Sequence, residues 1–129
     1  MNHVQQFLLS GGSVQDLKDK FNLNVKPHKH YPELVNIKYN SLVDSDWNNP
    51  MVCESRGLIL NKDDNWATVA RGYDKFFRYN EKQVANVNYN KCRYYTKADG
   101  NLMTMWSYKG EWHVSTTGSA DAGGNVGEL

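Results

Sequence analysis

The sequence predicts an α+β fold in which antiparallel strands form a sheet and one or two N-terminal helices lie on its outside. Two segments with helical periodicity come first, and apolar runs separated by short turn signals follow. A length of 129 residues, with 40% hydrophobic and 12% aromatic residues, is typical of one folded domain with one core. We therefore expect a single α+β unit.

The helical pattern occupies the first part of the chain. Residues 2–9 are expected to form a short helix that ends at Gly11 and Gly12. Ser13 then has the properties of an N-cap for a second helix. The apolar positions of this second helix are spaced three and seven residues apart, as on one face: Val14, Leu17 and Phe21. We expect this face to cover a sheet.

Strand patterns begin after a polar segment. Residues 26–30 contain a proline and two histidines, and without a third ligand we interpret them as a solvated loop rather than a metal site. Residues 34–39 are predicted to form a strand, and residues 44–50 a polar loop. A hairpin over residues 58–70 is predicted, with its turn at residues 63–65.

A second hairpin is predicted over residues 101–116, because Lys109 and Gly110 supply a two-residue turn between two strand-like runs. Residues 91–96 are expected to form the strand that leads into Lys97. Residues 117–129 are rich in Gly, Ala and Ser and have no apolar period. We expect the chain to be part of a larger domain.

Composition excludes several classes of protein. The formal net charge is +1, so a nucleic acid would have to bind a local basic patch. No apolar run approaches the roughly 20 residues that span a bilayer, and the N-terminus does not resemble a secretory signal. We expect a cytoplasmic protein with no membrane partner, in which Cys53 and Cys92 are reduced thiols.

Lys97, Asp99 and Gly100 carry the strongest chemical signal. A lysine amine can attack phosphorus and form a covalent intermediate, but it must be neutral when it attacks. Neighbouring apolar and aromatic side chains are expected to provide dry surroundings for it: Tyr94, Tyr95, Leu102, Met103 and Met105. The alternative is a tight turn between two strands, which Asp and Gly also favour.

Two upstream segments carry charges that suit phosphate binding. In a strand, Glu54 and Arg56 would point to the same face, either as a surface ion pair or with Arg56 as a planar fork for a phosphate. Residues 73–81 interleave basic and aromatic side chains, which suits nucleotide or RNA binding. The alternative is a strand whose phenylalanines fill the core.

Three motifs together resemble the N-terminal part of the phage-type RNA ligase 1 family, within the covalent nucleotidyltransferase superfamily that also contains DNA ligases and capping enzymes. Lys97-Ala98-Asp99-Gly100 is similar to the nucleophile motif of the superfamily. Glu54-Ser55-Arg56-Gly57 and Asp74-Lys75-Phe76-Phe77, the latter followed by Asn80-Glu81, resemble two upstream elements of the RNA ligases. The resemblance implies an antiparallel sheet that is part of an adenylation domain.

The resemblance also implies a reaction and a site. Lys97 would attack the α-phosphate of ATP and retain AMP, which passes to an RNA 5′-phosphate before a 3′-hydroxyl seals the strand. Arg56 would lie beside the phosphates or ribose, with Lys75 and Phe77 in the nucleotide pocket. The implied nucleotide-binding residues are Glu54, Arg56, Lys75, Phe77, Asp99 and Gly100. We expect the Lys97 side chain at the floor of an ATP-sized cleft on which Arg56 and Lys75 converge.

The chain departs from the family at two points. A basic residue often precedes the Gly-Ser of the third family motif, whereas Thr117 precedes Gly118 and Ser119 here, so Thr117 is assigned no role. The downstream acidic and paired-lysine motifs lie outside these 129 residues. Mg²⁺ or Mn²⁺ is implied as a cofactor with no nameable ligands, and we expect weak activity of this chain alone.

The implied partners are RNA ends, with tRNA as one substrate class, and we expect a monomer in a bacterial or virus-infected cytoplasm. Two other functions stay open. One is a non-catalytic nucleotide- or RNA-binding module derived from a ligase fold. The other is a DNA ligase or capping-type enzyme, which would use a different acceptor.

Overall fold

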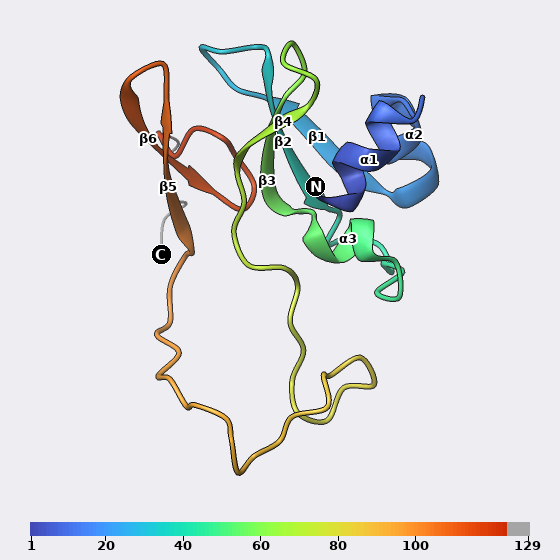
Figure 1. The fold of residues 1–129 in the computed structure, drawn as a ribbon, viewed down its shortest axis with the longest axis vertical. Helices are drawn as coiled ribbons and strands as arrows, with labels where there is room; N and C mark the ends of the chain where they lie inside the picture. The colour runs from blue at the N-terminus through green and yellow to red at the C-terminus, as the bar shows by residue number, and fades with distance from the viewer. Residues whose placement is uncertain (124–129) are drawn as a thin grey trace.

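The computed structural model describes residues 1–123 and has three layers (Figure 1). Helices cover one face of a four-stranded antiparallel sheet, and a two-stranded hairpin covers part of the other face. The predicted α+β class is confirmed. Among residues 1–123, no helix has the length and apolar character needed to cross a bilayer.

The four-stranded sheet follows the chain order β1-β2-β3-β4. Its strands are β1 (Leu23–Pro27), β2 (Leu34–Tyr39), β3 (Arg56–Asn61) and β4 (Ala67–Ala70). The predicted strand at residues 34–39 and the predicted hairpin at residues 58–70 are confirmed. Strands β2 and β3 are the most buried because each has neighbours on both edges and layers on both faces.

Strand β1 corrects part of the interpretation of residues 26–30 as a solvated loop, whereas Lys29 and His30 lie in an exposed loop as expected. Lys26 and Pro27 end this edge strand, where a proline removes no hydrogen bond needed by an inner neighbour. The imidazole of His28 is buried, with 6% of the residue exposed. Its Nδ1 accepts hydrogen bonds from the amides of His30 and Tyr31 at 3.0 and 3.2 Å.

Three short helices lie on one face of the sheet. Helix α1 (His3–Leu9) begins at the N-cap Asn2, and α2 (Val14–Phe21) begins with a capping box between Ser13 and Asp16; both predicted helices are confirmed. Helix α3 (Pro50–Glu54) was not predicted and has Pro50 in its first turn. The buried apolar side chains between these helices and the sheet are Val4, Leu8, Leu17, Leu23, Val35, Ile37, Met51, Val52, Leu58 and Leu60.

The hairpin of β5 (Met103–Tyr108) and β6 (Glu111–Thr116) is confirmed as predicted. Its turn residues Lys109 and Gly110 have φ values of 49° and 78°, which a two-residue turn with the twist of the strands requires. Trp106 is buried against Leu34 and Ile59 of the sheet. This second apolar cluster fixes the hairpin to the face opposite the helices.

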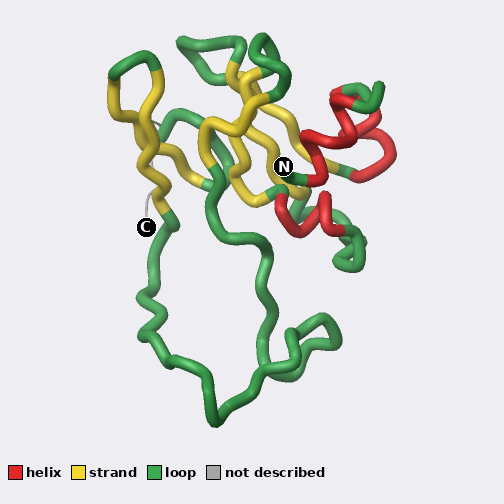
Figure 2. The backbone as a smooth tube through the Cα atoms, in the orientation of Figure 1, coloured by secondary structure: helices red, strands yellow, loops and turns green. Residues whose placement is uncertain are grey.

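Residues 71–102 contain no helix or strand and extend away from the layers (Figure 2). The prediction of a strand over residues 91–96 is wrong. A strand needs a partner for its backbone hydrogen bonds and cover for its large side chains, and here Tyr94 and Tyr95 are 78% and 80% exposed.

Gly57 is the point at which the pairing of β3 with β2 shifts by one residue. Ile37 pairs with Leu58 and Lys38 with Arg56, so Gly57 is the extra residue of a bulge and has a φ of +81°. A Cβ at this position would lie 2.9 Å from the Cα of Thr117. Gly57 thus allows β3 to touch the segment that follows β6.

We predict that Gly57→Ala lowers the free energy of unfolding by about 2 to 4 kcal/mol, because a left-handed backbone and a backbone clash act together. Gly110→Ala is the matched control, since Gly110 has φ +78° and no atom within 4 Å of a built Cβ. It should cost only about 1 to 2 kcal/mol. Equal losses in urea unfolding would contradict the close approach at Gly57.

His28 gives the fold a dependence on pH. Burial lowers the pKa of His28 below its usual value of 6.5, so on acidification the unfolded chain takes up this proton first. The stability that neutral His28 contributes is therefore present above about pH 6.5 and is lost as the pH falls below it. In urea unfolding at pH 7.5 and 5.5, His28→Asn, which keeps an acceptor for the His30 amide, should lose less stability than the wild-type protein. An identical pH response of the two proteins would refute this prediction.

Candidate functional site

The residues predicted to form one site lie in three parts of the structure. Arg56 begins β3, Lys75 and Phe77 lie at the start of the 71–102 segment, and Lys97 lies in its second half. Lys97 is exposed, as are Asp99 and Gly100, and no ion pair within residues 1–123 includes Lys97.

The predicted dry surroundings of Lys97 are absent. Tyr94, Tyr95, Leu102, Met103 and Met105 are all exposed rather than packed around its amine. For Tyr94 and Tyr95 the physical reason is the missing strand at residues 91–96, because only a paired strand would hold these side chains against a sheet. Met103 and Met105 do lie on a paired strand, β5, but they alternate with the buried Trp106 and so occupy the exposed face of the hairpin. Gly100 has φ +140° and lies at a bend, but no strand precedes it, so the alternative of a tight turn between two strands is not observed either.

Arg56 is poised to accept an anionic ligand. Its guanidinium lies 4.9 Å from the ring centroid of Phe76, a distance typical of a cation–π contact. One of its terminal nitrogens, Nη1, is buried and has no hydrogen-bond partner in the described part of the chain. A buried donor of this kind is stabilised by an acceptor such as a phosphate oxygen.

Lys75 lies in an aromatic site that the sequence only partly indicated. Its ammonium is 5.4 Å from the ring centroids of both Trp47 and Phe77, and its backbone amide donates to the carbonyl of Cys53 at 2.8 Å. Trp47 packs edge-on against Tyr39 and Phe77. Beside these rings is a cavity of about 530 Å³, which suits a planar aromatic ligand such as a base.

Trp47 is the residue that sequence analysis missed. It lies in the Asp-, Asn- and Ser-rich stretch of residues 44–50, whose composition indicates only a loop. The signal that was available was a single large aromatic residue in an otherwise polar segment. Trp47 contacts Phe77, which is distant in the sequence, so local composition does not indicate this contact.

Arg56 and Lys75 contact different aromatic groups in this structure. Phe76 lies beside Arg56, whereas Phe77 and Trp47 lie beside Lys75. Successive side chains of an extended segment point to opposite sides, so Phe76 and Phe77 lie on opposite sides of the chain. Arg56 and Lys75 therefore contact different surfaces of this segment. The expected convergence of Arg56, Lys75 and Lys97 on one cleft is not present.

The prediction that Glu54 and Arg56 share a strand face is wrong, because α3 ends at Glu54 and β3 begins only at Arg56. The Glu54 carboxylate is buried, with 3% of the residue exposed. It accepts hydrogen bonds from the amides of His3 and Val4 at the start of α1 and lies 3.9 Å from Arg71. Glu54 thus joins α3 to α1, and a nucleotide contact for it stays a prediction.

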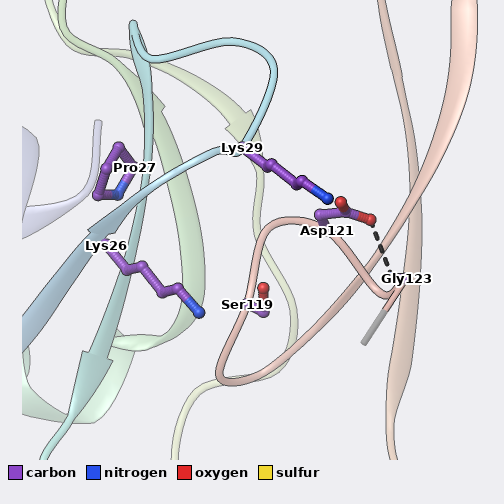
Figure 3. Close-up of a pocket in the computed structure, with 6 residues that line it drawn as sticks. All are labelled: Lys26, Pro27, Lys29, Ser119, Asp121 and Gly123. Carbon is purple, nitrogen blue, oxygen red and sulfur yellow. Dashed lines mark hydrogen bonds between the residues drawn. The ribbon is translucent and has the colours of Figure 1, made fainter. Parts of the chain in front are cut away.

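A second cavity, of about 370 Å³, lies between β1 and the segment after β6 (Figure 3). Lys26, Lys29 and Ser119 line it together with Asp121, whose carboxylate accepts a hydrogen bond from the amide of Gly123 at 2.9 Å. That hydrogen bond lowers the pKa of Asp121, so the carboxylate is charged and offsets the attraction of the two lysines for an anion. No residue predicted for the nucleotide site lines this cavity.

Metal ligands are not grouped in the described region. Within residues 1–123, no three His, Cys, Asp or Glu side chains lie close enough together to hold a metal ion.

Comparison with known proteins connects this geometry to a family. The family model for RNA ligase of the phage T4 RNA ligase 1 type matches residues 54–128. The chain is 37% identical, over 133 aligned residues, to a candidate bifunctional polynucleotide kinase/RNA ligase of Autographa californica nuclear polyhedrosis virus. The alignment covers 95% of this chain and 18% of that protein, so the chain spans about a fifth of its relative. No solved structure matches.

We predict that Glu54→Gln destabilises the fold by about 1 to 3 kcal/mol, because two backbone amides of α1 lose a charged acceptor. Glu111→Gln removes a charge from an exposed position on β6 and should change stability by less than about 0.5 kcal/mol. Urea unfolding measures both. A Glu54→Gln variant as stable as the control would show that the carboxylate contributes nothing to the packing of α1.

Proposed function

Because this chain belongs to the RNA ligase family, we propose that it forms part of the adenylation domain of an ATP-dependent RNA ligase, with Lys97 as the nucleophile. The observation that carries the proposal is the family match over residues 54–128, which contains all three motifs that sequence analysis identified. The matched region includes Glu54, Arg56, Lys75 and Lys97.

The proposed reaction proceeds in three steps, each with a defined nucleophile and leaving group. The neutral Lys97 amine attacks the α-phosphorus of ATP, a phosphorus–nitrogen bond forms, and pyrophosphate leaves. An RNA 5′-phosphate oxygen then displaces the lysine and takes the AMP. Finally a 3′-hydroxyl attacks the activated 5′-phosphate, and AMP leaves as the phosphodiester forms. In each step the protein contributes positioning and charge neutralisation.

Arg56 and the Lys75 site supply two parts of a nucleotide site. Arg56 offers an unpaired, partly buried guanidinium for phosphate oxygens, and Trp47 and Phe77 offer aromatic faces beside the Lys75 ammonium. Asp99 and Gly100 follow the nucleophile and are proposed to shape its turn. Glu54 is proposed to act by positioning, since it fixes α3 directly before Arg56.

The proposal requires the second half of the 71–102 segment to move toward the sheet. The start of the segment is already fixed by the Lys75–Cys53 backbone hydrogen bond and by Phe76 against Arg56. Residues 93–101 are exposed, so little packing opposes their displacement. ATP bound by Arg56 would attract the Lys97 ammonium through its phosphates before the lysine loses its proton.

A divalent cation, Mg²⁺ or Mn²⁺, would neutralise the phosphates of ATP in this reaction. Mg²⁺ commonly binds through one or two carboxylates together with the substrate phosphates. The described residues hold no ready-made metal cluster, so we assign no protein ligand and derive no step through the metal.

A non-catalytic nucleotide- or RNA-binding module is the second candidate. The observation that favours it is the exposed position of Lys97, apart from both Arg56 and Lys75. A DNA ligase or capping-type enzyme would share the lysyl-nucleotide step and differ in the acceptor. Competition among 5′-phosphorylated RNA, nicked DNA and a 5′-diphosphate transcript distinguishes these acceptors.

We predict that incubation with ATP and Mg²⁺ or Mn²⁺ adds one AMP to the protein, detected by intact mass and mapped to Lys97. Lys97→Ala should abolish the adduct, because no other amine occupies the nucleophile position. Lys91→Ala, which removes another exposed lysine of the same segment, should retain it. We expect sealing of RNA by these 129 residues to be weak.

An adduct that persists in Lys97→Ala, or is lost equally in Lys91→Ala, would exclude Lys97 as the nucleophile. If no adduct forms even when the remainder of a related ligase is supplied in trans, the binding-module function is favoured instead.

A further inference from the structure

Lys38 and Arg56 form a cross-strand pair of like charge. They are directly opposite in the register of β2 and β3, so their side chains lie on the same face of the sheet. Like charges at opposed positions of neighbouring strands are destabilising. Such a pair is tolerated best where a third, negative group sits between the two cations.

No carboxylate of the described chain supplies that negative group. The other cross-strand neighbour of Lys38 is Asn24 of β1, which is uncharged. None of the ion pairs within residues 1–123 includes Lys38 or Arg56. Both side chains are only half-exposed, so water screens their repulsion less than at an open surface.

The backbone of residues 117–118 lies over this pair. The side-chain amide of Asn36, which is 1% exposed, donates to the carbonyl of Thr117 at 3.3 Å. The Lys38 Nζ would lie 3.8 Å from a Cβ built on Gly118, and Gly57 touches Thr117 from β3. Thr117 carries no charge, and Lys38 from the neighbouring strand places a cation beside Gly118.

Two buried polar atoms of this face lack partners. They are Nη1 of Arg56 and the side-chain oxygen of Asn36. A phosphate oxygen would satisfy the Arg56 donor, and a hydroxyl group such as that of a ribose would satisfy the Asn36 acceptor. A ligand that carries both groups matches the unsatisfied atoms better than an inorganic anion does.

We propose that Lys38 binds the polyphosphate of ATP together with Arg56, on the sheet face beneath residues 117–118. The identity of the ligand as ATP rests on the proposed function, whereas the anion-binding property rests on the geometry alone. Lys38 acts here by binding and charge neutralisation, and Lys97 keeps the covalent role.

Calorimetric titration with inorganic tripolyphosphate and with ATP, in low salt and without metal, tests the proposal. Lys38→Met should weaken both affinities about tenfold, as expected for the loss of one charge-assisted contact. Lys38→Arg should restore most of the affinity. Lys62→Met, which removes an exposed lysine just after β3, should leave both affinities unchanged.

Thermal unfolding supplies an independent readout. Without an anion, Lys38→Met should melt at a higher temperature than the wild-type protein, because the like-charge pair is gone. Tripolyphosphate should raise the melting temperature of the wild-type protein more than that of Lys38→Met. A structural role for Lys38 in the sheet would instead lower the melting temperature of the variant.

The possible failures are distinguishable. Wild-type protein that binds no tripolyphosphate, or a Lys38→Met variant with unchanged affinities, overturns the Lys38 site even if Lys97 forms its AMP adduct. Tripolyphosphate binding that depends on Lys38, with no adduct even when the remainder of a related ligase is supplied in trans, supports the anion site and removes the ligase reaction. If a 5′-phosphorylated RNA oligonucleotide requires Lys38 and ATP does not, the site binds the RNA end and the proposal for ATP is wrong.

Discussion

The pairing of β2 with β3 is the constraint on which the rest of the structure depends. These are the two strands with neighbours on both edges, and they contribute apolar side chains to both cores. Val35, Ile37 and Leu58 face the helices, whereas Leu34 and Ile59 face the hairpin. Each layer is held by burial against this pair rather than by its own local stability.

The bulge at Gly57 connects this pairing to the candidate site. It changes the register so that Arg56 is opposite Lys38, and it lets residues 116–117 approach the sheet closely. A side chain at Gly57 would separate the two layers at the place where the unsatisfied Arg56 nitrogen lies. The same backbone feature therefore shapes both the core and the site, which is common where a bulge re-aims a side chain.

The candidate site is divided between rigid and weakly packed elements. Arg56 and Lys38 lie on the sheet. Near α3, the Lys75 ammonium lies beside the rings of Trp47 and Phe77. Lys97 lies instead in an exposed segment without regular structure. Side chains on strands are held in position before a ligand arrives, whereas Lys97, the proposed nucleophile, would depend on the ligand to order its segment.

The sequence by itself determined the α+β class, both N-terminal helices, the strand at residues 34–39 and the two hairpins, because these depend on local periodicity, caps and turn residues. It also determined membership of the RNA ligase family through motifs that are contiguous in the chain. Only the tertiary structure decided that residues 91–96 are not a strand, that His28 is buried and that Glu54 caps α1. It likewise decided that Trp47 meets Lys75 and that Lys38 is opposite Arg56. The reason is physical: pairing, burial and charge contact join residues far apart in sequence, and no local pattern encodes which partner a side chain meets.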